Sequence, residues 1–259
     1  MEISLKNKVI VITGGTKGVG RAVAEEACKS GARVVISGRD SKDGKEVINS
    51  IKEKYNGEAI FIKGCLKKID NCKKLIDEAV NNYGEIDGLV NYAGITTRAT
   101  ITEIDENILN DVIDINFKSS FYCSTYAIKS MMKSNGGSIV NIASTHAYGG
   151  AIDMSAYGCS KGAMVTLSKH IAKNYAKHLI RSNAIIMGWS ATPSEIKLHK
   201  SWDLDIDALN EKGRDIIPMG RLQVNEDFVP AILFLLSDLS SHLTDSELCI
   251  NGGFWPEYG

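Results

Sequence analysis

The chain has 259 residues, of which 44% are hydrophobic and 24% are charged, and its formal net charge is −1. This composition is typical of a globular protein with a sizeable core, and a near-neutral charge without basic clusters argues against nucleic acid as a partner. The first residues lack the order of a signal peptide, and the apolar run 229–236 is too short to span a bilayer, so we expect a cytoplasmic protein that does not enter the membrane.

Short β-branched runs alternate with longer amphipathic stretches along the chain. The runs predicted as strands are 8–13, 32–37, 58–63, part of 86–94, 137–144, 180–187 and 247–250. The predicted helices run from residue 19 to Gly31, then to about Tyr55, then to about Tyr83, and over 103–133, 155–178 and 226–237. Strands that are apolar on both faces and alternate with helices predict an α/β fold: a doubly wound parallel sheet of about seven strands with helices on both faces. We expect one domain over 1–259, in which 189–220 is an insertion that covers the substrate site.

Cysteine and histidine are scattered along the chain. The six cysteines form no CxxC pair, and none of the five histidines sits at helical spacing with another metal ligand. We therefore expect free thiols and no metal site.

A glycine-rich segment, GGTKGVG at 14–20, joins the first strand to the first helix. Glycine lets the backbone approach a phosphate closely, and a helix N-terminus offers free N–H groups to an anion. The spacing of Gly14, Gly18 and Gly20 is GxxxGxG and differs from the GxGxxG dinucleotide fingerprint. Its position at the first strand–helix junction still predicts a nucleotide site.

The end of the second strand indicates which dinucleotide binds. NAD sites place an acidic residue there for the ribose 2′-hydroxyl, but this chain has Arg39 and no carboxylate before Asp40. Arg39 and Lys17 are suited to clamp a 2′-phosphate. We therefore predict NADP(H) rather than NAD(H).

Tyr157 and Lys161 lie four residues apart in a predicted helix, so they share one face of it. A free tyrosine has a pKa of about 10, and lowering it to about 7 takes roughly 4 kcal/mol of preferential stabilisation of the phenolate. A nearby lysine and a nicotinamide cation are able to supply this. Ser144 ends the fifth strand, thirteen residues before Tyr157, and belongs to the same edge of the sheet.

Taken in order, the motifs of this chain resemble those of the short-chain dehydrogenase/reductase family over essentially the full length. They are TGGTKGVG (13–20), NYAG (91–94), Asn116, Ser144, YGCSK (157–161), MGWSAT (187–192) and NGG (251–253). The resemblance implies a Rossmann-like fold and an oxidoreductase that interconverts a secondary alcohol and a ketone. It implies that Tyr157 exchanges a proton with the substrate oxygen, that Ser144 binds this oxygen, and that Lys161 lowers the Tyr157 pKa and holds the nicotinamide ribose. Asn116 would support a water that relays protons to Lys161.

The resemblance also implies the cofactor contacts and the assembly. The contacts are Gly14, Thr16, Lys17, Gly18, Val19, Gly20, Arg39, Leu66, Asn91, Ala93, Gly94, Tyr157, Lys161, Gly188, Ser190 and Thr192. The chain departs from the family pattern at Cys65 and Leu66 in place of an Asp–Val pair, at Tyr92, and at Met187 in place of a proline. Members of the family are commonly dimers or tetramers, so a homodimer or homotetramer is expected.

Aromatic residues suggest which small-molecule alcohol or ketone is the substrate. His146, Tyr148, Trp189 and Trp202 are expected to line the substrate cleft. Apolar walls favour a bulky apolar substrate such as a hydroxysteroid. The aromatic tail after Asn251 could instead pack at a subunit interface.

Other functions remain open. One is a 3-oxoacyl-(acyl-carrier-protein) reductase, which needs a basic docking patch near the cleft; Lys129, Lys133 and Arg181 are its candidates. Others are a sugar or polyol dehydrogenase and a nucleotide-sensing protein that is not an enzyme.

Overall fold

The computed structural model describes residues 2–192, 195–196 and 206–256. Seven strands form one parallel sheet in the order β3-β2-β1-β4-β5-β6-β7. Their bounds are β1 Val9–Thr13, β2 Arg33–Gly38, β3 Ala59–Lys63, β4 Gly88–Asn91, β5 Gly137–Ser144, β6 Ile180–Met187 and β7 Glu247–Ile250. Strand order reverses between β1 and β4, so a crevice opens at the carboxyl ends of these two strands. The predicted doubly wound sheet is confirmed.

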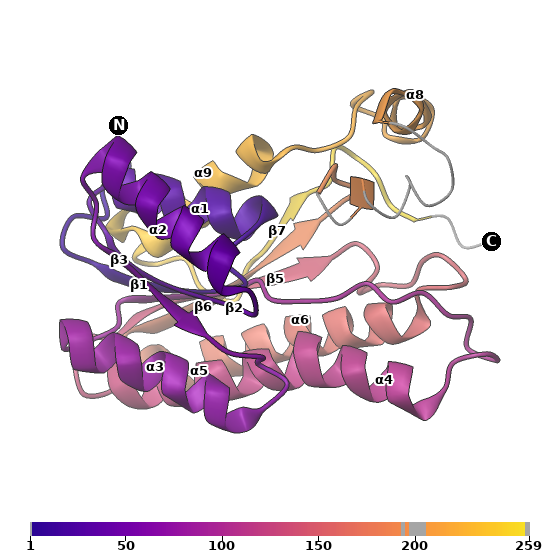
Figure 1. The fold of residues 1–259 in the computed structure, drawn as a ribbon. Coiled ribbons are helices and arrows are strands. Elements are labelled where there is room, and N and C mark those ends of the chain that lie inside the picture. Colours follow the sequence, from indigo (N-terminus) through magenta and orange to yellow (C-terminus); the bar gives the residue numbers. More distant parts are fainter. Residues whose placement is uncertain (1, 193–194, 197–205, 257–259) are drawn as a thin grey trace.

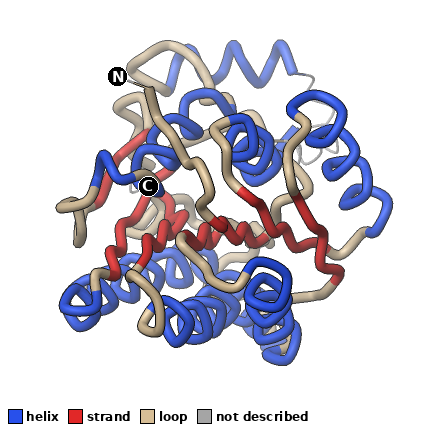
Figure 2. Tube along the Cα trace, turned by 90° about the vertical axis from the view of Figure 1, so that its left-hand side faces the viewer, coloured by secondary structure: helices blue, strands red, loops and turns tan. Residues whose placement is uncertain are grey.

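Helices cover both faces of the sheet (Figures 1 and 2). One layer contains α1 Gly18–Lys29, α2 Ser41–Tyr55 and α9 Asn225–Leu236. The other contains α3 Ile69–Tyr83, α4 Glu106–Val112, α5 Ser119–Met131 and α6 Ser155–Tyr175. Each layer packs its own buried cluster against the sheet, with Val23, Ile51 and Phe228 in the first and Leu75 and Met131 in the second.

The strands form where the sequence is richest in β-branched residues. Val9–Thr13 are all buried, because the strand lies in the middle of the sheet with helices on both sides.

Helix α2 begins after the N-cap residue Asp40. The carboxylate of Asp40 accepts hydrogen bonds from the backbone N–H of Lys42 at 2.7 Å and of Asp43 at 3.4 Å. Asp40 is therefore engaged in helix capping.

The predicted helix over 103–133 is interrupted by a different helical geometry. Between α4 and α5 the chain forms a π-helix over Ile113–Lys118. Short π-helical segments rearrange the backbone hydrogen bonds and are frequent at functional sites. The side chain of Asn116 is presented from this segment.

Part of the expected insertion is helical. The helix α8, Ile206–Ile216, lies to one side of the α1–α2–α9 layer (Figure 1). Trp189 and Ala191, at the start of the expected insertion, form hydrogen bonds with Gln223, which precedes α9. The N–H of Ala191 donates to the Gln223 carbonyl at 2.9 Å, and the N–H of Gln223 donates to the Trp189 carbonyl at 3.1 Å. The role of 189–220 as a lid stays a prediction.

Candidate active site

The glycine segment forms a tight turn between β1 and α1. Gly14 and Gly18 have positive φ angles of 70° and 54°, which side chains rarely adopt. A Cβ on Gly14 would lie 3.1 Å from the Cα of Ala93, and a Cβ on Gly20 would lie 2.6 Å from the Gly14 carbonyl oxygen. The side chain of the N-cap residue Lys17 accepts no hydrogen bond from the first turn of α1, so it leaves the N–H groups of this turn available to a ligand. This cradle fits the pyrophosphate of a dinucleotide.

The end of β2 lies beside the glycine turn. The N–H of Gly14 donates to the Ser37 hydroxyl at 3.3 Å, and the N–H of Gly15 to the Ser37 carbonyl at 3.1 Å. Arg39 is exposed and lines the adjoining cavity. Lys17 also lines it, but its ammonium lies 2.7 Å from the carboxylate of Asp43, which raises the Lys17 pKa.

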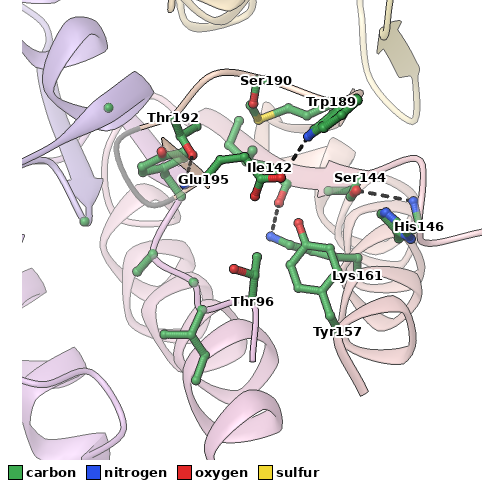
Figure 3. Close-up of a pocket in the computed structure, with 18 of the residues that line it drawn as sticks. Thr96, Ile142, Ser144, His146, Tyr157, Lys161, Trp189, Ser190, Thr192 and Glu195 are labelled. Carbon is green, nitrogen blue, oxygen red and sulfur yellow. Dashed lines mark hydrogen bonds between the residues drawn. The ribbon is translucent and has the colours of Figure 1, made fainter. Parts of the chain in front are cut away.

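Three of the four predicted catalytic residues meet where β5 and α6 approach each other (Figure 3). Ser144 ends β5, and Tyr157 and Lys161 lie in the first two turns of α6. The Lys161 ammonium donates to the Ile142 carbonyl of β5 at 2.7 Å and lies 5.6 Å from the centroid of the Tyr157 ring. The helical spacing and the parallel sheet together therefore bring Ser144, Tyr157 and Lys161 to one wall.

Burial shifts both titratable groups of this wall. Burial raises the pKa of Tyr157 to about 12, and the hydrogen bond from Ser144 acts in the opposite direction by lowering this pKa. Burial lowers the pKa of Lys161 to about 8. Tyr157 is thus protonated at neutral pH and holds a proton that it can donate, while Lys161 remains mostly charged.

Asn116 holds the loop that follows β4. Its amide oxygen accepts from the N–H of Ile95 at 2.8 Å, and its amide nitrogen donates to the Ile95 carbonyl and to the Ser160 hydroxyl, both at 3.0 Å. A Cβ on Gly94 would lie 3.3 Å from the Asn116 amide oxygen and 3.8 Å from the Lys161 ammonium. Asn116 and Lys161 therefore both border Gly94.

A cavity of about 860 Å³ joins the glycine turn to the catalytic wall. The predicted site residues that line it are Gly14, Thr16, Lys17, Gly18, Arg39, Leu66, Ala93, Gly94, Ser144, His146, Tyr157, Lys161, Gly188, Trp189, Ser190 and Thr192. The volume of the cavity and its mixture of polar and apolar lining residues suit a dinucleotide together with a small-molecule substrate.

The remaining predicted site residues are not among those that line the cavity. Val19, Gly20, Asn91, Asn116 and Tyr148 do not line this cavity, and Trp202 lies outside the described residues.

Two of these residues have clear structural partners. The Asn91 amide donates to Ser124 and to the Asn141 amide oxygen, both at 2.9 Å, and so links β4 to α5 and β5. The ring of Tyr148 packs edge-on against Trp255 at 5.5 Å instead of facing the cleft as expected. Tyr148 is 42% exposed.

The departures from the family pattern are accommodated in the fold. Leu66 is 8% exposed and lines the cavity beside Cys65. Tyr92 lies against Gly20, where a Cβ would come within 2.6 Å of the ring, so the large aromatic ring occupies space that the glycine leaves open. Met187 is 8% exposed and ends β6 next to Gly188, whose N–H donates to the Ile250 carbonyl at 3.0 Å.

Four charged residues of the cavity were missed by the sequence reasoning: Arg98, Glu195, Lys212 and Asp215. Arg98 donates to both carboxylate oxygens of Asp153 at 3.0 Å, and Glu195 accepts a hydrogen bond from the indole of Trp189 at 2.8 Å. Both Arg98 and Glu195 line the cavity. They lie in loops or at a helix start, where no periodic pattern marks a residue. The one sequence signal was for Glu195: an acidic residue three positions after a threonine, here Thr192, is typical of a helix start.

The described part of the chain has neither a membrane-spanning helix nor a metal-binding cluster. No helix there is long and apolar enough to cross a membrane. No group of three or more His, Cys, Asp or Glu side chains there is arranged to hold a metal ion.

Comparison with known proteins identifies relatives along the whole chain. A family model described as short chain dehydrogenase matches residues 8–202. A 3-oxoacyl-(acyl-carrier-protein) reductase of Aquifex aeolicus is 30% identical over 98% of this chain and 100% of its own length. The dehydrogenase/reductase SDR family member 4 of Caenorhabditis elegans is 34% identical over 96% of this chain and 95% of its own.

Solved structures agree with this result. A short-chain type dehydrogenase/reductase from Mycobacterium marinum superposes with a TM-score of 0.90 at 28% identity, covering 97% of this chain and 96% of that one. A candidate NAD(P)-dependent gluconate 5-dehydrogenase from Beutenbergia cavernae, with NADP bound at low occupancy, superposes with a TM-score of 0.89 at 29% identity, covering 97% and 98%. Fold, family model and full-length relatives agree, and the chain belongs to the short-chain dehydrogenase family of oxidoreductases.

Proposed function

We propose that this protein is an NADP(H)-dependent oxidoreductase that interconverts a secondary alcohol and a ketone. The observation that carries the proposal is the single cavity that has the glycine cradle and Arg39 at one end and Ser144, Tyr157 and Lys161 at the other. A dinucleotide that lies along this cavity brings its nicotinamide to the catalytic wall.

Each residue of the wall has a part in the reaction. When bound, the nicotinamide supplies hydride transfer. Tyr157 donates its phenolic proton to the substrate oxygen during reduction and accepts it during oxidation. Ser144 donates a hydrogen bond to the same oxygen and orients it.

Lys161 acts on Tyr157 and on the cofactor. Its charge, placed 5.6 Å from the Tyr157 ring, favours the phenolate that oxidation requires. Its ammonium also has a donor for the nicotinamide ribose hydroxyls, since one of its three N–H groups is directed at the Ile142 carbonyl and another at the Met164 sulfur, 3.6 Å away. Asn116 keeps the loop at Ile95 in place and, with Lys161, borders the position at Gly94 where a relaying water would bind.

The preference for NADP(H) is supported by the charges at the end of β2. Asp40, the first acidic residue after this strand, is engaged as the N-cap of α2. Arg39 and Lys17 both line the cavity at this end. A 2′-phosphate would find two cations here, whereas a ribose 2′-hydroxyl would find no carboxylate presented to it at the strand end.

The lining near Tyr157 favours a polar substrate over the hydroxysteroid expected from the sequence. Of the aromatic residues on which that expectation depended, Trp189 and Phe254 line the cavity, whereas Tyr148 and Trp255 pack on each other. The wall also contains charged and polar groups: Thr96, Arg98, His146, Glu195, Lys212 and Asp215. A bulky apolar substrate would remove water from these charged and polar groups, which costs free energy even where Asp153 and Trp189 remain as partners of Arg98 and Glu195.

A second candidate is reduction of a 3-oxoacyl thioester on a carrier protein. The relative from Aquifex aeolicus carries this name at 30% identity, which favours the candidate. The expected docking residues do not support it: Arg181 is near the start of β6, and its guanidinium donates to the carbonyls of Leu235 and Ser237 at 2.8 and 3.2 Å. Lys129 lies in the last turn of α5 and Lys133 follows this helix, at the same edge of the sheet as the start of β5. All three are at the edge opposite the cavity.

Titration of the intrinsic tryptophan fluorescence with NADPH and NADH tests the proposal, followed by a panel of secondary alcohols and ketones with the preferred cofactor. We expect tighter binding of NADPH, and Arg39→Asp should reverse the preference. Preferred binding of NADH by the unmodified protein would contradict the roles of Lys17 and Arg39. Tight binding without turnover of any alcohol or ketone would favour a nucleotide sensor.

A further inference from the structure

Two segments that are far apart in the sequence line the catalytic end of the cavity. The first is the loop between β5 and α6, which contributes His146, Ala151 and Met154. The second is the tail after β7, which contributes Phe254 and Pro256. Both lie on the side of the molecule where α8 is found (Figure 1). What joins these two segments therefore determines how far this end of the cavity opens.

The tail is fixed as far as Phe254. The Asn251 amide nitrogen donates to the Phe254 carbonyl, and the N–H of Phe254 donates to the Asn251 carbonyl, both at 2.9 Å. The Phe254 side chain packs against a buried cluster that includes Ile217. Trp255 and Pro256 form no backbone hydrogen bond with another residue of the described ranges 2–192, 195–196 and 206–256. The course of the tail past Phe254 therefore depends on side-chain packing.

Trp255 faces the opposite way from its two neighbours. Phe254 and Pro256 line the cavity, whereas Trp255 does not, which is the alternation of an extended segment. The Trp255 ring lies 5.5 Å from the ring of Tyr148 at an interplanar angle of 78°, the edge-to-face arrangement that aromatic rings favour. Tyr148 belongs to the loop after β5 and does not line the cavity either. The contact therefore ties the tail to this loop on the outer side of the cavity wall.

This contact is suited to open while the rest of the protein stays folded. Tyr148 and Trp255 are 42% and 47% exposed, and neither lies in one of the described helices or strands. Segments with few buried apolar contacts open at a low cost in free energy. Segments that open and close over a site control which molecules reach it. The two rings therefore have the position and the exposure of a reversible closure.

We propose that the contact between Tyr148 and Trp255 acts as a latch that limits the size of the substrate. While the two rings touch, Phe254 and Pro256 stay in the cavity wall, and a substrate too large for the space beside Tyr157 is excluded. The inference rests on the proposed alcohol–ketone function and adds its selectivity by size. Tyr148 and Trp255 are specificity-determining residues that act through the tail, since neither lines the cavity.

Two ketones that differ in one substituent test the latch: cyclohexanone and 4-phenylcyclohexanone. Each is reduced to its alcohol by hydride from NADPH and one proton, and NADP⁺ is released. The measured quantity is the ratio of kcat/KM for the phenyl derivative to kcat/KM for cyclohexanone. We expect a ratio below about 0.1 in the unmodified protein and a rise of at least about tenfold in Trp255→Ala and in Tyr148→Ala, because a pocket wall discriminates by size to this extent. If cyclohexanone is not reduced, the smallest ketone that is reduced and its phenyl derivative take their place.

Matched variants show whether the two rings act as a pair. Trp255→Phe and Tyr148→Phe keep two rings in contact and should leave the ratio within about threefold of its original value. The double alanine variant should have the same ratio as each single one, because all three lack the same contact. Phe121→Ala removes an exposed ring of α5 that lies edge-on to Tyr122 at 5.8 Å, away from the cavity, and should not change the ratio.

NADPH binding shows that each variant is folded. If Tyr148→Ala fails this check, Trp255→Ala decides, since it changes only the exposed tail.

The outcomes separate the latch from the proposed function. An unmodified protein that reduces both ketones equally well, or a ratio that stays unchanged in the alanine variants, overturns the inference and leaves the proposed function standing. Gains that add up in the double variant also overturn it, because the two rings would then act separately. A smaller particle in size-exclusion chromatography with an unchanged ratio overturns it too and assigns the aromatic tail to a subunit interface. Reduction of no ketone in the whole panel by protein that binds NADPH overturns the proposed function.

Discussion

The ammonium of Lys161 lies 5.6 Å from the centre of the Tyr157 ring and donates a 2.7 Å hydrogen bond to the carbonyl of Ile142. The bond to β5 fixes the position of a charge that is 4% exposed, next to a phenol whose pKa burial raises to about 12. The same burial lowers the pKa of Lys161 to about 8. Lys161 is thus mostly protonated at neutral pH and loses its charge as the pH rises through about 8.

This titration predicts the pH dependence of cofactor binding. Only protonated Lys161 presents a full set of donors to the nicotinamide ribose, so affinity should be retained below about pH 8 and decline as pH rises through it. Tyr157 titrates at higher pH, and burial lowers the pKa of His146, so neither interferes between about pH 7 and 9.5. Fluorescence titration with NADPH across this range measures the effect. Lys161→Arg, which stays charged, should remove the inflection; an inflection that persists in this variant would assign it to another group.

Replacement of Tyr157 by phenylalanine should separate chemistry from binding. The variant lacks the proton that is exchanged with the substrate oxygen, so kcat/KM should fall about 10²- to 10⁴-fold. NADPH affinity should change less than about threefold, since the ring remains in place. Tyr126→Phe, in α5, is the matched control for loss of a phenolic hydroxyl and should keep full activity. Near-normal turnover in Tyr157→Phe would show that another group supplies the proton.

The ion pair between Lys17 and Asp43 should limit the affinity for NADPH. The ammonium and carboxylate lie 2.7 Å apart in this structure, so a 2′-phosphate competes with Asp43 for Lys17. Asp43→Asn should tighten NADPH binding by about 2- to 5-fold and leave NADH binding nearly unchanged, because the Lys17 side chain is 66% exposed and water screens the pair. Asp77→Asn, which breaks the exposed pair with Lys73 in α3, is the control. Equal gains for both cofactors would argue against a 2′-phosphate contact at Lys17.

The cradle itself can be tested through Gly14. Gly14→Ala should lower the free energy of unfolding by about 1–3 kcal/mol, because alanine is strained at a φ of 70° and its Cβ would lie 3.1 Å from the Cα of Ala93. Gly84 has a φ of 88° but no atom within 4 Å of an added Cβ, so Gly84→Ala carries the strain without the contact. Urea denaturation should show the larger loss for Gly14→Ala, and only this variant should lose NADPH affinity. Equal losses in both variants would mean that the contact with Ala93 contributes nothing.

Local patterns in the sequence were sufficient for most of the fold and for bringing Ser144, Tyr157 and Lys161 together. β-Branched runs alternating with amphipathic stretches predict the strands and helices, because each strand is buried on both faces and each helix on one. The pair Tyr157 and Lys161 follows from helical periodicity alone, since side chains at i and i+4 share a face. Ser144 joins them because the carboxyl ends of parallel strands meet at one edge.

Contacts between separate segments of the chain were decided only by the packed structure. Asn116 holds Ile95, Trp189 holds Glu195, and Lys17 pairs with Asp43, each across a sequence separation that no periodicity encodes. For the same reason Tyr148, predicted to face the cleft, lies against Trp255. The direction of a loop side chain depends on where distant segments pack, so the mixed charges that line the cavity became visible only in three dimensions.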